Sequence, residues 1–222
     1  MIIFMRHGKM LPPYDNYESL TLFDLDSLGL RSVDPDVDSD FVWYGLKQQP
    51  AMRPLIENCD RFICSESRRT RQSCEIIMKW AGINEAVAQD SRLNEIMFLP
   101  SAWCGDYVER PLENLRQNLY QAVESENHNA EPRSSVLARL QDFFKENAQR
   151  NVFCVTHGFL MNYMKLYLSD VLGISVSSCL SADDHVPYLG IMNINVDNPR
   201  KPSPARSQDI MPRLSVTGPA VS

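Results

Sequence analysis

Short runs of consecutive apolar residues alternate along this chain with longer segments in which apolar residues recur every three or four positions. Runs of the first kind are typical of strands buried on both faces, and spacing of the second kind is typical of amphipathic helices. The predicted strands are residues 1–5, 61–64, 86–89, 151–155 and 189–196. The predicted helices are residues 44–58, 67–80, 112–124, 135–147 and 160–172. Strands that alternate with helices predict an α/β fold, a three-layer α/β/α sandwich with a mainly parallel central sheet.

Prolines and long polar segments interrupt this pattern at three places. Pro50 and Pro54 fall inside the first predicted helix, which must therefore kink or begin late. Residues 11–40 read as a long acidic loop, and loops of that length are usually functional or partly mobile. Residues 198–222 hold five prolines and many small polar residues, which predicts a tail without a core of its own. The expected organisation is one domain over residues 1–197, followed by this tail.

Two of the predicted strands lead into the same pair of residues, His-Gly. The first strand is followed by Arg6-His7-Gly8, and the strand at residues 151–155 is followed by Thr156-His157-Gly158. Open α/β sheets bind their ligands at the carboxyl ends of the strands. Imidazole is also the side chain best suited to change its protonation near neutral pH. The placement of two of the four histidines at such positions therefore indicates chemistry rather than packing.

Composition and charge narrow the class of protein. The 222 residues are 44% hydrophobic and 23% charged, which is ordinary for a soluble globular domain. A net charge of −6 argues against nucleic acid or a membrane surface as the main partner. The sequence has neither a signal-peptide pattern nor an apolar stretch that spans a bilayer, and its six cysteines form no C-x-x-C pair. These features predict a cytoplasmic protein with free thiols and leave the oligomeric state open, a homodimer included.

A third segment adds a concentration of positive charge. Residues 64–73 contain a predicted strand end and then a helix start that carries Arg68, Arg69 and Arg71. Phosphoryl transfer through a histidine needs a nucleophilic imidazole, fixed cations around the phosphoryl oxygens and an acid for the leaving oxygen. A helix N-terminus contributes backbone N–H donors and a partial positive charge to the same anion. The arginines and the two imidazoles together favour phosphoryl chemistry.

Four motifs, in this order, resemble the first branch of the histidine phosphatase superfamily, also called phosphoglycerate-mutase-like. The family's motifs are R-H-G, S-x-x-x-R-A-x-Q-T, L-x-E and V-S-H-G. The segments that match them are Arg6-His7-Gly8, residues 65–73, Leu93-Asn94-Glu95 and Val155-Thr156-His157-Gly158. In the second motif Thr70 stands in place of Ala and Ser73 in place of Thr. R-H-G alone is a weak signal, whereas four motifs that each follow an expected strand form a specific one.

This resemblance implies a role for each matched residue. His7 would take the phosphoryl group as a covalent intermediate, and Arg6, Arg69 and His157 would hold its oxygens. Glu95 would act as the acid and then as the base for the attacking water. No metal and no organic cofactor would be needed. The other residues expected to bind phosphate or substrate are Gly8, Lys9, Ser65 and Gly158.

The chain departs from the family after Gly8. Many members continue R-H-G-E-T-x-x-N, whereas Lys9 and Met10 follow here, and Lys9 is a candidate for a compensating point charge. The family's helix start L-T-x-x-G-x-x-Q is matched only in part by residues 41–48, which makes Gln48 a candidate for the substrate rim. The Gly-Trp pair of the mutases is absent. The expected activity is a phosphatase acting on a phosphorylated small molecule or a phosphoprotein. The alternatives are a non-catalytic relative that binds a phosphorylated ligand or partner and, less favoured, a phosphoglycerate-type mutase.

Three further segments carry weaker signals. Trp103 lies in the helical insert expected over the active site, at about residues 97–132, where it is a candidate rim residue. His185 follows Asp183-Asp184 and is a second rim candidate, while a metal site is disfavoured there because no further ligands have regular spacing. The alternating aspartates of residues 34–40 lack the central Gly and terminal Glu of a calcium loop. They are expected to form a solvated face.

Overall fold

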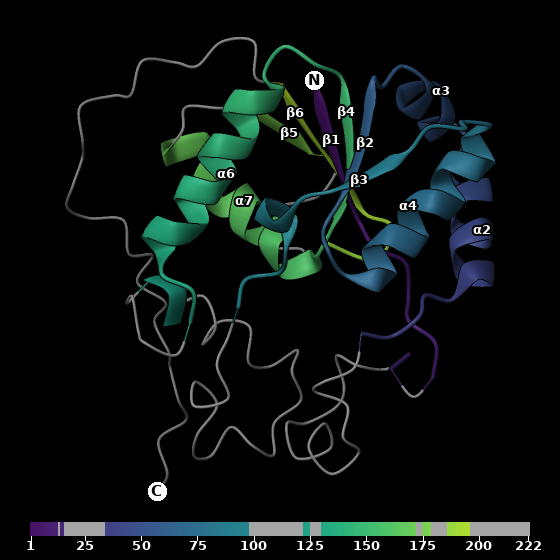
Figure 1. The fold of residues 1–222 in the computed structure, drawn as a ribbon, viewed down its shortest axis with the longest axis horizontal. Helices are drawn as coiled ribbons and strands as arrows, with labels where there is room; N and C mark the ends of the chain where they lie inside the picture. The colour runs from purple at the N-terminus through teal and green to yellow at the C-terminus, as the bar shows by residue number, and fades with distance from the viewer. Residues whose placement is uncertain are drawn as a thin grey trace, which may run out of the picture.

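A six-stranded mixed sheet forms the centre of the protein (Figure 1). The computed structural model describes residues 1–12, 14–15, 34–97, 122–124, 130–171, 175–178 and 186–195. The strands are β1 (Ile2–Arg6), β2 (Arg61–Cys64), β3 (Val87–Gln89), β4 (Val152–Thr156), β5 (Ser175–Ser178) and β6 (Ile191–Asn195). In the order β3-β2-β4-β1-β6-β5 the first four strands are parallel, and β6 is antiparallel to both of its neighbours. The predicted mainly parallel sheet is confirmed.

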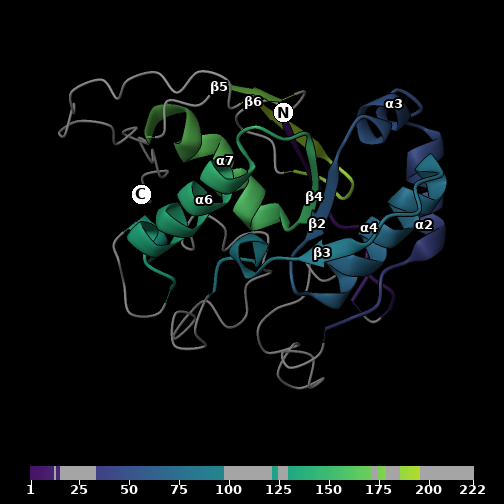
Figure 2. The ribbon, with the colours of Figure 1, turned by 45° about the horizontal axis from the view of Figure 1, so that its top comes forward.

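Helices cover both faces of this sheet (Figures 1 and 2). The helices on one face are α2 (Ser39–Lys47), α3 (Met52–Glu57) and α4 (Arg68–Ala81). The helices on the other face are α6 (Arg133–Asn147) and α7 (Gly158–Val171). A short 3-10 helix, η3 (Ser91–Leu93), follows β3. The three layers confirm the predicted α/β/α sandwich.

The central strands β1, β2 and β4 are apolar over most of their length because each of them contributes to two cores. In β1, Phe4 belongs to the core under α6 and α7, where its ring lies 6.0 Å from that of Phe143. Its neighbours Ile3 and Met5 belong instead to the core under α2, α3 and α4. Successive side chains of a strand point to opposite faces, and all of these are fully buried. A strand in such a position has no polar face, so its sequence shows a run rather than an alternation.

The segment predicted as one kinked helix over residues 44–58 is in fact two helices. α2 begins earlier, at Ser39, because the Asp38 carboxylate accepts a hydrogen bond from the Phe41 backbone N–H at 3.0 Å and caps the helix. α2 ends before Pro50, and α3 begins after it. The partial motif match at residues 41–48 therefore covers the body and C-cap of α2 rather than its start.

The predicted strands and helices elsewhere differ from the structure mainly at their ends, with one omission. The edge strand β5 was not predicted, because its sequence Ser-Val-Ser-Ser contains one large apolar residue and an edge strand can remain polar. The predicted helix at 112–124, the insert at 97–132 and the tail at 198–222 lie wholly or mostly outside the described residues. Within the described segments, no helix combines the length and apolar character needed to cross a bilayer.

Candidate active site

The carboxyl ends of β1 and β4 bring the two His-Gly segments together. The parallel register pairs Arg6 with Thr156, so the following residues, His7 and His157, extend beyond the same edge of the sheet. The His7 backbone N–H donates to the Thr156 carbonyl oxygen at 3.0 Å. The two imidazole rings lie edge to face with their centroids 5.4 Å apart, and the residues are 5% and 2% exposed. The two histidines are therefore buried neighbours.

Hydrogen bonds assign the tautomer of His7. Its Nδ1 lies 2.8 Å from the Gly8 carbonyl oxygen, which can only accept, so Nδ1 carries the proton. Its Nε2 is then an acceptor, and the Arg69 Nε–H donates to it at 3.3 Å. The unprotonated nitrogen of an imidazole is the one that attacks an electrophile. His7 thus presents its nucleophilic nitrogen on the side where Arg69 lies.

Arg69, in the first turn of α4, lies between the two imidazoles. Its Nε donates to His7, and its Nη2 donates to Nδ1 of His157 at 3.2 Å. These two nitrogens form one edge of the planar guanidinium, and such an edge can bind two oxygens of a phosphate. The third nitrogen, Nη1, donates to the Asp34 carboxylate at 2.9 Å. Asp34 also accepts from the Arg68 backbone N–H, so its carboxylate lies at the positive N-terminus of α4.

His157 adopts the opposite tautomer. Because Arg69 donates to its Nδ1, the proton lies on Nε2, which donates to the Ser65 hydroxyl at 2.8 Å. The Ser65 hydroxyl in turn lies 2.8 Å from that of Thr70, the residue that replaces Ala in the resembled motif. Burial is the main cause that lowers the pKa of His157 well below its ordinary value, and the charge of Arg69 lowers it further. His157 is therefore neutral at neutral pH.

Arg6 is held by the segment just before β6 and by the start of α7. Its Nη1 donates to the Val186 carbonyl oxygen at 2.8 Å, and its guanidinium carbon lies 3.9 Å from the centroid of the Tyr188 ring. A Cβ atom at Gly158 would lie 2.8 Å from the Arg6 Nε, which is closer than packed atoms allow. The second His-Gly pair thus needs its glycine so that Arg6 can pass close to the α7 backbone.

Glu95 reaches the site from the segment after η3. The Thr156 hydroxyl donates to the Leu93 carbonyl oxygen at 2.6 Å and holds this segment against β4. The Glu95 carboxyl group accepts from the backbone N–H groups of Phe159 and Leu160, at 3.2 and 2.8 Å, in the first turn of α7. Although the residue keeps some exposed surface, burial of its carboxyl group raises the pKa of Glu95, and the backbone hydrogen bonds offset only part of this effect. A carboxyl group that holds its proton to higher pH is suited to act as an acid.

Gly8 is tightly enclosed on the side of α2. Its backbone N–H donates to the Ser73 hydroxyl at 2.9 Å, and Ser73 donates to the Arg69 carbonyl oxygen at 2.7 Å. A Cβ atom at Gly8 would lie 2.3 Å from Cγ2 of Val42 and 2.8 Å from Cγ2 of Val37. Only glycine fits there without displacing α2.

Residues 34–38, which we call the acidic segment, are tied to the loop after Gly8. Met10 forms an isolated antiparallel bridge with Val37, and the Lys9 carbonyl oxygen accepts from the Asp38 N–H at 2.7 Å. Asp36 accepts from the Gln72 side chain at 2.6 Å. Together with Asp34 on Arg69 and Asp38 on α2, these contacts engage three of the four alternating aspartates. The carboxylates of Asp34 and Asp36 stay partly exposed, in keeping with the predicted solvated face, but the extended segment also lets alternate carboxylates reach two helix N-termini.

Of the predicted rim residues, the structure describes Gln48 alone. Gln48 is exposed at the C-terminal end of α2, whereas the contact between Asp38 and Lys9 lies at the other end of that helix. Trp103 and His185 lie outside the described residues. Lys9 follows Gly8 directly, and its side chain makes no hydrogen bond or ion pair with the parts of the chain that the structure describes.

Two residues of the site were missed from the sequence. Asp34 carried a weak signal, since the period of two in the aspartate run places alternate side chains on the same side of an extended segment. Tyr188 carried none, because the sequence does not reveal that the segment before β6 folds back against Arg6.

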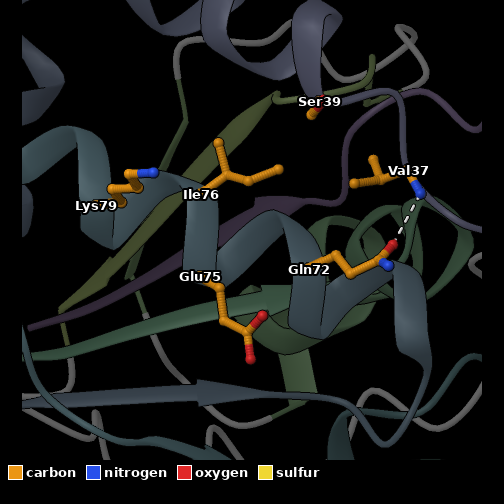
Figure 3. A pocket seen from close by; sticks show the side chains of 6 residues that line it. All are labelled: Val37, Ser39, Gln72, Glu75, Ile76 and Lys79. Carbon is orange, nitrogen blue, oxygen red and sulfur yellow. Dashed lines mark hydrogen bonds between the residues drawn. The ribbon is translucent and has the colours of Figure 1, made fainter.

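A separate hollow of about 330 Å³ lies on the outer side of α4 and does not include the histidines (Figure 3). Its lining residues are Val37, Ser39, Gln72, Glu75, Ile76 and Lys79. The Gln72 side chain in this hollow accepts from the Val37 backbone N–H, so it supports the acidic segment from outside the site. Among the described residues, no group of three or more His, Cys, Asp or Glu side chains is arranged to hold a metal ion.

Several solved structures share this fold at low sequence identity. One is a mycobacterial glucosyl-3-phosphoglycerate phosphatase in complex with VO3 (TM-score 0.55, 15% identity, 90% of this chain and 99% of that chain covered). Another is phosphoserine phosphatase from Entamoeba histolytica in complex with 3-phosphoglyceric acid (TM-score 0.52, 17% identity, 86% and 87% covered). A third is a mycobacterial hydrolase (TM-score 0.52, 16% identity, 88% and 96% covered). No curated protein matches the sequence.

The family model of the histidine phosphatase superfamily (branch 1) matches residues 2–183. This match spans both His-Gly segments, the start of α4 and Glu95, which are the parts that form the site described above. The chain therefore belongs to the histidine phosphatase superfamily, branch 1.

Proposed function

We propose that this protein is a phosphatase that hydrolyses a phosphomonoester through a phosphohistidine intermediate on His7. The observation that carries the proposal is the Arg69 guanidinium between two buried imidazoles, with Nε2 of His7 unprotonated. This arrangement combines a nucleophile with a two-donor edge for phosphoryl oxygens. Membership of the family, and the phosphatases among the structures with the same fold, support the same reaction class.

In the first step, Nε2 of His7 attacks the phosphorus atom, a P–N bond forms and the P–O bond to the alcohol breaks. Arg6 and Arg69 hold the non-bridging oxygens and stabilise their charge in the transition state. The protonated carboxyl group of Glu95 donates its proton to the departing oxygen, which the raised pKa of Glu95 supports. The Nδ1–H of His7 remains on the Gly8 carbonyl oxygen, which stabilises the positive charge of the phosphorylated ring.

In the second step, water attacks the phosphorus atom and the P–N bond breaks. The Glu95 carboxylate takes a proton from this water, so both His7 and Glu95 return to their starting states. The net reaction converts ester and water into alcohol and inorganic phosphate. The negative charge of a bound phosphoryl group raises the proton affinity of the neighbouring His157, and a proton on its Nδ1 would then donate to a phosphoryl oxygen.

The proposal also covers the cellular compartment, the metal requirement and the kind of substrate. We infer a cytoplasmic enzyme that needs no metal ion and acts on a phosphorylated small molecule or a phosphoprotein. The net charge of −6 supports neither nucleic acid nor a membrane as its partner. Free cysteines at Cys64, Cys74 and Cys154 are buried with raised pKa values, which suits a reducing compartment.

A second candidate function is the binding of a phosphorylated ligand or partner without turnover. The observation that favours it is the Asp34 carboxylate on Nη1 of Arg69, which lowers the positive potential available to a phosphoryl group. The Lys9-Met10 continuation, in place of the Glu-Thr of many members, points the same way. The retained pair of imidazoles and Glu95 favours catalysis.

The decisive experiment follows release of p-nitrophenol from p-nitrophenyl phosphate in the presence of EDTA, together with intact-mass detection of an acid-quenched phosphoenzyme. The wild-type protein is expected to turn over and to show one added phosphoryl group, and His7→Ala is expected to show neither. Full activity of His7→Ala would rule out the mechanism. Loss of wild-type activity with EDTA, restored by a divalent cation, would rule out metal independence.

The matched control is His128→Ala, which removes a histidine outside all four motifs and should leave turnover unchanged. The binding alternative predicts a different pattern, in which inorganic phosphate binds measurably but neither phosphoenzyme nor product forms across a broad panel of phosphate esters. A mutase would move the phosphoryl group between positions of one substrate without releasing phosphate.

A further inference from the structure

A short turn, residues 186–190, returns the chain to β1 immediately before β6. The Gly190 N–H closes the turn by donating to the Pro187 carbonyl oxygen at 2.9 Å. The turn is also hydrogen-bonded to the end of β1. The Arg6 N–H donates to the Gly190 carbonyl oxygen at 3.0 Å, and the Leu189 N–H donates to the Arg6 carbonyl oxygen at 3.2 Å. From α7, the Asn162 side chain accepts from the Val186 N–H at 3.1 Å. The turn is therefore fixed from two elements of the fold.

The backbone of this turn has a conformation that a leucine rarely adopts. Leu189 has a φ of 60°, the one positive φ of a non-glycine residue in the described segments. Its side chain is buried at 2% exposure, and a Cβ atom at Gly45 of α2 would lie 2.5 Å from its Cδ1. A branched residue persists in such a conformation only where the surrounding structure requires it, and such positions cluster at functional sites.

The turn places the Tyr188 ring directly against Arg6 and His7, the two residues proposed to hold and to attack the phosphoryl group. The Arg6 guanidinium carbon lies 3.9 Å from the ring centroid, and the His7 ring centroid lies 5.7 Å away. The ring also meets Phe41 of α2 edge to face at 6.2 Å. The same turn supplies the Val186 carbonyl oxygen that accepts from Arg6. Arg6 is thus held in its plane by a hydrogen bond at one edge and by an aromatic face.

We propose that Tyr188 is a positioning residue for phosphate binding, which acts by stacking on the Arg6 guanidinium beside His7. A stacked guanidinium keeps its N–H groups in the plane parallel to the ring, where they remain directed at a ligand's oxygens. The ring also covers one face of Arg6 and thereby strengthens its attraction for an anion by excluding water. The contribution to phosphate affinity expected of such a stack is about 5- to 30-fold.

The inference rests on the proposed function only in that both place a phosphoryl group at His7. The test therefore measures binding of inorganic phosphate by titration calorimetry, and KM and kcat for p-nitrophenyl phosphate beside it. Tyr188→Leu is expected to weaken phosphate binding and to raise KM by the same 5- to 30-fold factor, whereas Tyr188→Phe keeps the stack and both values. The amount of acid-quenched phosphoenzyme measures the fraction of protein molecules with an active site. Partial misfolding lowers this fraction without changing KM or the affinity for phosphate, whereas misplacement of Arg6 changes both.

Tyr44→Leu is the matched control, because Tyr44 is a tyrosine on α2 that is 68% exposed. The proposal is overturned if Tyr188→Leu binds phosphate as the wild-type protein does, or if Tyr188→Phe loses as much affinity as Tyr188→Leu. A wild-type protein that binds phosphate without turnover would contradict the proposed function while leaving the role of Tyr188 open to the same binding measurement. The two proposals thus fail in different experiments.

Discussion

A single guanidinium distinguishes two histidines that look alike in the sequence. Arg69 donates to Nε2 of His7 but to Nδ1 of His157, so the two rings carry their protons on opposite nitrogens. The remaining nitrogens are satisfied by the Gly8 carbonyl oxygen and the Ser65 hydroxyl. Each ring therefore presents an unprotonated nitrogen to Arg69, Nε2 in His7 and Nδ1 in His157, and the choice of His7 as the nucleophile belongs to the proposed function.

The role proposed for Glu95 predicts a dependence on the leaving group. In Glu95→Gln the departing oxygen receives no proton, so hydrolysis of an alkyl phosphate should fall by about 10²- to 10⁴-fold. An aryl phosphate with a good leaving group, such as p-nitrophenyl phosphate, should lose far less in the rate of phosphoenzyme formation. Single-turnover kinetics with the two substrates measures the difference.

The same variant has a consequence for the pH profile. Since burial raises the pKa of Glu95, the wild-type rate with an alkyl phosphate should fall as the pH rises through that pKa and the carboxyl group loses its proton. The rate of Glu95→Gln should not show this fall, which is the alkaline limb of the pH profile. Equal losses for the alkyl and aryl substrates, with the limb retained, would show that Glu95 is not the acid.

At the scale of elements, the sequence was most informative where the apolar pattern was strongest. β1, β4, α4, α6 and α7 lie within a few residues of their predicted bounds, because each helix buries an apolar face in one core and each of the two strands buries side chains in both cores. The start of α2 was missed because it depends on the cap by Asp38, in a segment that looked like solvated loop. The edge strand β5 was missed because its pairing with β6, rather than apolar burial, defines it.

The close packing of the first His-Gly pair on α2 predicts a specific energetic coupling. Gly8→Ala places a methyl group 2.3 Å from Cγ2 of Val42 and should lower the free energy of unfolding by about 1–3 kcal/mol. Val42→Ala alone should cost roughly 2 kcal/mol through its cavity. Together they should cost about 1–2 kcal/mol less than the sum of the single changes, because the small residue makes room for the methyl group.

Urea denaturation of the four proteins in this cycle measures the coupling. Gly45→Ala combined with Val42→Ala is the control pair, since the close contact at Gly45 is with Leu189 rather than with Val42. Strict additivity for Gly8 and Val42 would contradict the contact as described.

At the scale of the whole molecule, the buried site makes folding stability depend on pH. Burial, followed by the charge of Arg69, lowers the pKa of His157 below its ordinary value of 6.5. The unfolded chain therefore binds a proton at this residue at a pH where the folded protein does not. The stability linked to His157 is fully present above pH 6.5 and is lost as the pH falls from there toward the folded pKa. Glu95 has the opposite sign, since its raised pKa favours the folded state at acid pH.

His157→Asn should remove this contribution. Below pH 6.5 the free energy of unfolding of the wild-type protein should fall more steeply with decreasing pH than that of the variant. The difference in slope should correspond to about one additional proton taken up on unfolding. Urea denaturation of both proteins from pH 5 to 8 gives the free energy of unfolding at each pH. The difference between the two curves isolates the contribution of His157. Parallel curves for the two proteins would contradict a neutral, buried His157.

The apolar pattern and the four motifs are enough to predict the layers of this protein and most of the side chains proposed for its site. Strands buried on both faces must be continuously apolar, and short motifs at their carboxyl ends place His7, Arg69 and Glu95 at one edge of the sheet. Three features of the site could not be predicted in this way: the proton positions on the two rings, the carboxylate of Asp34 on Arg69 and the ring of Tyr188 on Arg6. Each of these depends on contacts between residues far apart in the chain, and a local pattern carries no record of such contacts.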